Sequence, residues 1–433
     1  MLLTLINQKY KYFTNNISIA DLLVKVKSTG IYLLVPIVNF GVSIVTTPIF
    51  AKHLSASEFG IFGYFASLST FIGCFYGLLF QTYYMSAYFR ESADKRKQIL
   101  VTLLLFNILW NVFFFPISYF GLLFYFKITG LSMPFYPYAL LTLGAAVLGG
   151  YKGFVQVNYR LGEKPFPFFL IVSGYRVLSI IASLYFVVFA EMGLKGRLLG
   201  VVLVEILFFV ISLSHILKKQ EIRIDKEVLK HAFKIVLPLF PASFLYLPLG
   251  SFDNIVLARM DQPSEMGLYN IGKGIATYMY VALFPFYQTF EPNIYKNIVN
   301  KNIKALKSTG LILLLIVSIS VIAFWLVAPM IIDFLTAGKY HGAVKYANIL
   351  AITNGLMIIF SFFDAIINAL QATKKHLLIN SIIAVVCVCS YTLGGSYFGQ
   401  IGVAYATVGT FVVLILLQAG FVIRKFKRSV AAF

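Results

Sequence analysis

Twelve long apolar stretches run through this chain of 433 residues and constrain its fold more than any other feature. A membrane-spanning helix needs about 20 apolar residues. On that criterion the predicted spans are 29–51, 60–82, 99–126, 134–156, 166–190, 197–217, 235–257, 267–290, 309–337, 346–372, 376–397 and 401–423. The hydrophobic fraction is 60%, above the roughly 45–50% of soluble domains, and the mean hydropathy is +0.86. The sequence therefore predicts an all-α integral membrane protein.

The distribution of basic residues predicts the topology. Charged residues make up only 12% of the chain, yet the formal net charge is +20. Alternating the loops between two sides places 26 Lys and Arg on one side, together with both termini, and seven on the other. Because cytoplasmic loops collect Lys and Arg, this asymmetry favours twelve spans with both termini in the cytoplasm. It also accounts for most of the positive charge without a nucleic-acid partner.

Three short similarities at nearly one offset indicate an internal duplication. The turn Ser57-Glu58-Phe59-Gly60 recurs as Ser264-Glu265-Met266-Gly267, and two further matches follow in the same order: Gly130 and Tyr138-Ala139 with Gly338 and Tyr346-Ala347, and Gly193-x-x-Gly196 with Gly399-x-x-Gly402. We expect two six-helix lobes related by a pseudo-two-fold axis along the membrane normal, with the substrate path between them. The predicted divisions are an interfacial cytoplasmic segment at 1–28, lobes at 29–217 and 235–423, a cytoplasmic linker at 218–234 and a tail at 424–433.

Prolines concentrate in the first span of each predicted lobe. Proline bends or interrupts a membrane helix, and such helices usually line something other than lipid. Paired interrupted helices indicate a transporter site, although these prolines could also serve only to shape packing. The residues are Pro36 and Pro48 in the first span and Pro238, Pro241 and Pro248 in the seventh.

Two opposite charges flank the hairpin between spans 7 and 8. Asp253 lies nine residues before its midpoint near 262, and Lys273 lies eleven residues after it. At about 1.5 Å per helical residue, the two side chains should lie at nearly the same depth. They could form a neutralising ion pair, or Lys273 could meet an anionic group while the pair responds to a proton or a sodium ion.

Four further charges fall inside predicted spans. Arg176 in span 5 should face water, an acid or a ligand; Glu205 in span 6 is a candidate partner, and a cavity cation is the equal alternative. Lys152 is expected to extend toward the cytoplasmic interface. Asp364 could couple transport to an ion or could form a pair.

Several classes of chemistry are disfavoured. The five histidines show no ligand spacing, and the three cysteines lie in apolar runs, so we expect neither a metal nor a disulfide framework. There is no phosphate-binding G-x-x-x-x-G-K-[ST] run, and the N-terminus lacks the pattern of a cleaved signal peptide. No cofactor is expected beyond a proton or sodium ion as a coupling ion. Short loops disfavour a membrane polysaccharide polymerase.

The turn AKHLSASEFGIF after span 1, together with LPLFP, SFDNIVLA and SEMGLYNIGK at spans 7 and 8, resembles a known family. It is similar to the polysaccharide-transporter branch of the multidrug/oligosaccharidyl-lipid/polysaccharide flippase superfamily, particularly Wzx-type O-antigen flippases. Members commonly have Asp-Arg where this chain has Asp253-Asn254.

The resemblance implies a bacterial inner-membrane protein that moves an undecaprenyl-pyrophosphate-linked oligosaccharide to the outer leaflet. Polysaccharide polymerase and chain-length proteins would then be partners. Arg176 and Lys273 would contact pyrophosphate or sugar, and Asp253 and Asp364 would tune or couple transport. A sodium- or proton-coupled multidrug or metabolite exporter is the alternative, and a polysaccharide polymerase is the third hypothesis.

Overall fold

The computed structural model describes residues 19–218, 221–245 and 247–430, and within these ranges the chain is helical with no strand. Most of the interfacial segment predicted at 1–28 lies outside the described residues. The elements are α2 (Ile19–His53), α3 (Ala56–Gly77), α4 (Phe80–Tyr88), α5 (Ala93–Thr129), α6 (Tyr138–Leu161), α7 (Pro165–Phe169), η1 (Leu170–Gly174), α8 (Tyr175–Leu184), η2 (Tyr185–Phe189), α9 (Gly193–Leu217), α10 (Lys226–Phe244), α11 (Leu247–Ala258), α12 (Pro263–Val299), α13 (Ile303–Thr336), η3 (His341–Ala343), α14 (Val344–Ala369) and α15 (Thr373–Val430).

Nine helical segments in the described ranges are long and apolar enough to cross a membrane by length and composition. The chain is therefore a multi-pass membrane protein with an all-α fold, as predicted. Nine is fewer than twelve partly because the last segment, Lys374–Phe426, counts once. Gly399 divides it with φ 62° and ψ −151°, a conformation essentially restricted to glycine, so α15 consists of two arms. We call 373–398 its first arm and 400–430 its second arm.

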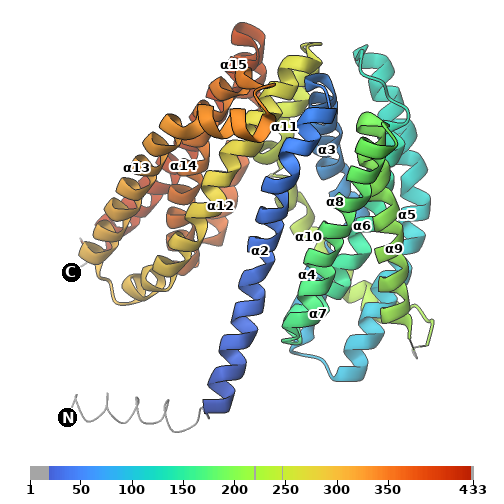
Figure 1. Ribbon diagram of the computed structural model, residues 1–433. Helices are drawn as coiled ribbons and strands as arrows, with labels where there is room; N and C mark the ends of the chain where they lie inside the picture. Colours follow the sequence, from blue (N-terminus) through green and yellow to red (C-terminus); the bar gives the residue numbers. More distant parts are fainter. Residues whose placement is uncertain (1–18, 219–220, 246, 431–433) are drawn as a thin grey trace, which may run out of the picture.

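The helices form two groups that meet at one end. Figure 1 shows α5 to α9 on one side and α12 to α15 on the other, with α2 running between them. The groups approach each other where α3, α11 and the start of α12 lie, and they diverge toward the opposite end. The two ends therefore differ in how closely the two groups of helices approach each other.

Two glycines allow α3 and α12 to pack closely at the end where the two helix groups meet (Figure 1), which we call the closed end. A Cβ on Gly267 would overlap the backbone of Ala56, and a Cβ on Gly60 would overlap the carbonyl oxygen of Pro263. These contacts are reciprocal, because Gly60 and Gly267 occupy matching places in the two similar turns. Only glycine allows backbones to approach so closely. Ser55 begins α3 with a capping box in which Glu58 accepts from the Ser55 N–H.

Part of the linker predicted at 218–234 is helical, and this helix packs on the first group. α10 begins at Lys226, so much of the range 218–234 is helical. Val228, Ala232 and Val236 of α10 are buried in one core with Phe80 of α4 and Leu103 of α5. The sequence assigned span 7 wholly to the second lobe, whereas the first half of this span packs against helices of the first.

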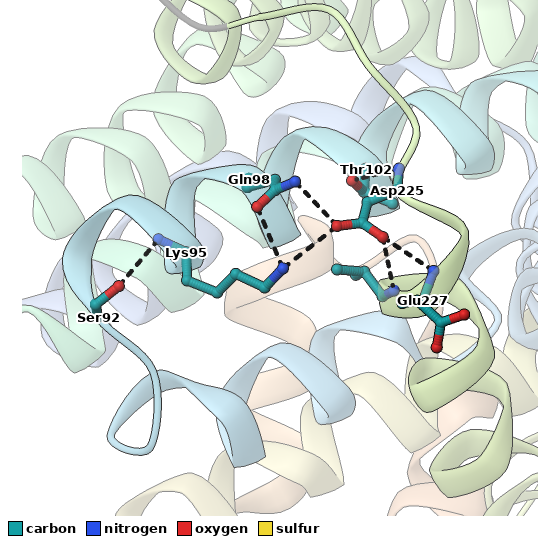
Figure 2. A network of polar contacts seen from close by, with 7 residues as sticks. Ser92, Lys95, Gln98, Thr102, Asp225 and Glu227 are labelled. Atoms are coloured by element: carbon teal, nitrogen blue, oxygen red, sulfur yellow. Dashed lines mark hydrogen bonds and ion pairs between the residues drawn. The ribbon is translucent and has the colours of Figure 1, made fainter.

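A polar network fixes the start of α10 (Figure 2). The Asp225 carboxylate lies 3.3 Å from Lys95 Nζ and accepts a 2.9 Å hydrogen bond from the Gln98 side chain, both on α5. The other Asp225 oxygen accepts from the N–H groups of Glu227 and Val228. Asp225 thus caps α10 and ties it to α5 with one side chain.

The interruptions differ from those predicted. α2 runs as one helix through Pro36 and Pro48, so the first span is not broken there. In the seventh span α10 continues through Pro238 and Pro241 and ends at Phe244, and α11 resumes at Leu247-Pro248. The second span is interrupted instead between α3 and α4, where Leu78 and Leu79 have φ of 46° and 54°.

Candidate functional site

Asp253 of α11 and Lys273 of α12 form an ion pair. Lys273 Nζ lies 2.6 Å from Asp253 Oδ2 and donates a 3.1 Å hydrogen bond to the Gly250 carbonyl. The Asp253 side chain is 4% exposed, whereas that of Lys273 is 33% exposed. The sequence indicated that the two residues lie at nearly the same depth, and in the structure they are in contact. The ammonium still has an accessible side, so pairing does not remove Lys273 from reach of a ligand.

Neighbouring polar groups hold this pair in place. The Tyr269 hydroxyl donates a 2.8 Å hydrogen bond to the same Asp253 oxygen that meets Lys273. The next residue, Asn254, donates from its side chain to Ser67 Oγ of α3 at 3.0 Å. The pair is therefore linked through the α11 backbone to the contact between the two helix groups. The Asn254 side chain therefore bridges the two groups through a neutral amide.

Arg176 lies on α8 between two π-helical turns, η1 and η2. Such turns shift the register of a helix and often occur at functional sites. The side chain is exposed, and its guanidinium donates a 3.2 Å hydrogen bond to Ser43 Oγ of α2. Among the residues that the structure describes, no carboxylate forms an ion pair with it. Arg176 is thus an accessible cation within an apolar span.

α2 connects Arg176 to the second helix group. Its Ser43 accepts from Arg176, and one turn further Thr47 Oγ1 lies 3.2 Å from the Tyr278 hydroxyl of α12. The Phe40 ring meets the Tyr278 ring edge-on at 5.0 Å. Tyr278 and Lys273 both lie on α12, and Arg176 lies on α8. α2 therefore contacts both helices that carry a candidate cation. Sequence reasoning missed Ser43, Thr47 and Tyr278 because they are uncharged residues without a motif.

Lys152 and Glu205 of the first helix group form an ion pair that the sequence did not predict. Glu205 does not pair with Arg176; it forms an ion pair with Lys152 instead. Lys152 therefore does not extend toward the interface. Its ammonium lies 3.7 Å from the centre of the Tyr175 ring, and the Lys152 and Glu205 side chains are 13% and 5% exposed. Burial among α6, α8 and α9 costs less when the two charges neutralise each other than when either is left alone.

Asp364 is paired at the end of α14. One carboxylate oxygen lies 2.8 Å from His376 Nε2, and the other accepts a 2.9 Å hydrogen bond from Asn368. Of the two alternatives left open by the sequence, the geometry favours pairing. Asp364 joins the end of α14 to the start of α15, and its partners in the described part of the chain are His376 and Asn368 rather than Lys273 or Arg176.

Within the described ranges, no cluster of three or more His, Cys, Asp or Glu side chains could hold a metal ion. The candidate site consists instead of two cations in different settings. Arg176 is exposed and donates to a serine hydroxyl, whereas Lys273 is paired with Asp253 and remains partly exposed. Each of these two donors can form charge-assisted hydrogen bonds with an anion.

Comparison with protein families decides the relationship of this chain. The sequence profile described as "Polysaccharide biosynthesis protein" matches residues 25–298, more than half of the chain. The chain belongs to this family. Comparison with curated proteins found no match. The resemblance inferred from the turn after span 1 and from spans 7 and 8 is confirmed at this level.

Solved transporter structures share the fold of this family member. A lipid II flippase, MurJ, in an inward closed conformation superposes with a TM-score of 0.70 at 16% identity, covering 93% of this chain and 89% of that one. An inward-facing multidrug resistance MATE transporter of the MOP superfamily gives 0.65 at 14% identity, covering 91% and 99%. The MATE transporter VcmN of Vibrio cholerae in its bent form gives 0.57 at 15%, covering 94% and 98%. At these identities the likeness establishes the fold.

Proposed function

We propose that this protein is a flippase that moves a polyprenyl-pyrophosphate-linked oligosaccharide, of the O-antigen kind, across the bacterial inner membrane. The observation that carries the proposal is Arg176, an exposed guanidinium in an apolar span with no acidic partner among the described residues. A cation at that depth costs several kcal/mol unless it meets water, an acid or a ligand. A pyrophosphate head group supplies the missing negative charge.

The proposed mechanism is alternating access of two six-helix lobes. Counting α10 with α11 as one span and α15 as two gives twelve spans with both termini on one side, which agrees with the distribution of basic residues. The reciprocal contacts of Gly60 and Gly267 support a pseudo-two-fold relation between the lobes. α2 lies between the groups and touches both, so it would line the path together with α3, α11 and α12.

In this mechanism the head group binds first to Arg176 and then to Lys273. Release of Lys273 from Asp253 would leave a buried carboxylate, so protonation of Asp253 or entry of a sodium ion would accompany that step. This assigns Asp253 the coupling role and leaves Asp364 as a structural pair. Polysaccharide polymerase and chain-length proteins would take the product on the outer face.

Replacing Arg176 with Ala in the native host tests the proposal. We expect surface polysaccharide to be lost and complete lipid-linked repeat units to accumulate on the cytoplasmic face. Arg176→Lys should retain part of the activity, because it keeps the charge but loses the planar fork. Arg223→Ala, which removes an exposed arginine of the linker, is the matched control. Normal surface polysaccharide in a well-expressed Arg176→Ala strain would exclude Arg176 from the site.

A proton- or sodium-coupled multidrug or metabolite exporter is the second candidate, and the shared fold with MATE transporters favours it over a polymerase. The two functions separate in a strain lacking the gene. Drug sensitivity with normal lipid-linked intermediates would support the exporter, whereas cytoplasmic accumulation of complete repeat units would support the flippase. Unpolymerised units on the surface would support the polymerase hypothesis.

A further inference from the structure

A cavity of about 440 Å³ lies between the two arms of α15, at the end of the molecule where α15 both begins and ends. Its lining divides into two chemical parts. Lys375 of the first arm and Arg424 and Lys425 of the second arm contribute three cations, and Leu378, Ile382 and Phe421 are among the apolar residues that form the rest. None of the residues that line this cavity is acidic.

The cations lie at one end of the cavity and the apolar residues continue from them into the membrane. Ile382 follows Lys375 by seven residues on the first arm, which is about 10 Å along a helix. The second arm runs in the opposite direction, so Leu417 lies beyond Arg424 at a similar depth. The cavity thus pairs a charged mouth with an apolar slot about 10 Å long.

Three like charges at one mouth repel each other unless an anion lies between them. Lys375, Arg424 and Lys425 are exposed, and in the described part of the chain no carboxylate forms an ion pair with any of them. Their backbone positions on two helix ends hold them near a common point. Basic pockets between helices at the cytoplasmic interface are suited to phosphate head groups of lipids.

We propose that this cavity binds an anionic phospholipid of the surrounding leaflet. The phosphate lies among Lys375, Arg424 and Lys425, and one acyl chain lies along the apolar slot between the arms of α15. A free phosphate would neutralise the cations but would leave the apolar slot unfilled. A neutral lipid would fill the slot but would leave the cations without an anion. The site shares no residue with the candidate transport site, and the proposal does not depend on the transported substrate.

The test is native mass spectrometry of the full-length protein in detergent, with equal amounts of dioleoyl phosphatidylglycerol and dioleoyl phosphatidylcholine. We expect wild type to retain phosphatidylglycerol about tenfold more than phosphatidylcholine. The triple variant K375Q/R424Q/K425Q should lose this preference, since each basic residue near a lipid surface contributes on the order of a few-fold in affinity.

Two further variants identify the cause. R90Q/K296Q/K304Q removes three exposed cations at the same end, from the turn after α4, the last turn of α12 and the first turn of α13, and should leave the preference intact. G420L retains every charge but fills the slot, because a Cβ at Gly420 meets open space, and it should reduce retention of the dioleoyl lipid. Dihexanoyl phosphatidylglycerol should be retained poorly by wild type.

Three results would overturn the proposal. Equal retention of the two lipids by wild type excludes selection of the head group. An equal loss in the control triple variant means that net charge alone attracts the lipid. Unchanged retention in G420L, or retention of the dihexanoyl lipid as strong as that of the dioleoyl lipid, means that the slot holds no chain. The wild-type and G420L measurements decide the question even where the cation variant does not fold.

Discussion

At the scale of residues, the two buried ion pairs differ in how much of the cation remains accessible. Lys152 is almost enclosed with Glu205 under the Tyr175 ring, whereas a third of the Lys273 side chain is exposed beside Asp253. We therefore assign the first pair to stability and the second to function. Two predictions separate these assignments.

Breaking the Lys152–Glu205 pair should destabilise the protein. Lys152→Met leaves an uncompensated carboxylate in the first helix group and is expected to cost about 3–5 kcal/mol, whereas Lys152→Met/Glu205→Gln should recover most of the loss. Unfolding in detergent, followed by fluorescence-detected size exclusion after heating, measures the difference. A double variant no more stable than the single one would show that the charges act separately.

Removing both charges of the other pair should separate stability from transport. Asp253→Asn/Lys273→Met leaves no lone buried charge, so we expect near wild-type thermal stability together with loss of surface polysaccharide. Lys152→Met/Glu205→Gln serves as the comparison and should retain the polysaccharide. Normal surface polysaccharide in the Asp253→Asn/Lys273→Met strain would make that pair structural.

At the scale of elements, the sequence predicts apolar helices well and their interruptions poorly. Asp253 and Lys273 lie at similar distances from the short turn that joins their two helices. Their contact could therefore be expected from the sequence alone. The break at Leu78-Leu79 could not, because leucine rarely adopts a left-handed conformation and only packing can impose it. The Lys152–Glu205 contact also depends on which helices are neighbours, which apolar periodicity does not specify.

The start of α10 should respond to acid through Asp225. Partial burial raises the pKa of its carboxyl, but hydrogen bonds from the Val228 N–H, from Lys95 and from the Glu227 N–H outweigh this effect and hold the pKa below its ordinary value. The stabilisation is therefore complete above the unfolded-state pKa of about 3.9 and is lost as the pH falls through the lower folded-state pKa.

Hydrogen exchange at residues 226–236 measures this response. We expect protection to be constant between about pH 5 and pH 8 once the intrinsic exchange rate is corrected, and to fall below about pH 4. Asp225→Asn should lower protection at neutral pH, whereas Glu227→Gln, whose side chain is exposed, should not. Equal protection in wild type and Asp225→Asn would show that apolar packing alone holds α10.

At the scale of the whole molecule, the two similar turns of the sequence meet at the end where the helix groups approach each other (Figure 1). The two similar turns are in contact: Gly60 of α3 packs against α12, and Gly267 of α12 packs against α3. The sequence could predict the family. It could not show that α10 would pack on the first helix group, because a helix with one apolar face fits either group.

Adding a single methyl group should open the closed end. Gly267→Ala places a Cβ on the Ala56 backbone, so α3 and α12 must separate. We expect a lower thermal stability and faster labelling of a cysteine introduced at Gln262 by a reagent added from outside intact cells. Gly274→Ala is the control on the same helix, because its Cβ would meet open space, and it should be neutral or stabilising by up to about 1 kcal/mol. Equal labelling in the two variants would contradict the assignment of this contact as a closure.

The reciprocal glycine contact also has an electrical consequence. Backbone packed on backbone leaves no space for water, and a transmembrane voltage falls mainly across the part of a path that excludes water. With the diverging end filled with solvent, most of the field would be concentrated at Gly60 and Gly267. Each elementary charge that crosses gains or loses about 2.3 kcal/mol per 100 mV. A voltage that is negative inside would then drive an anionic head group outward in a single step, at the moment when the two helices part.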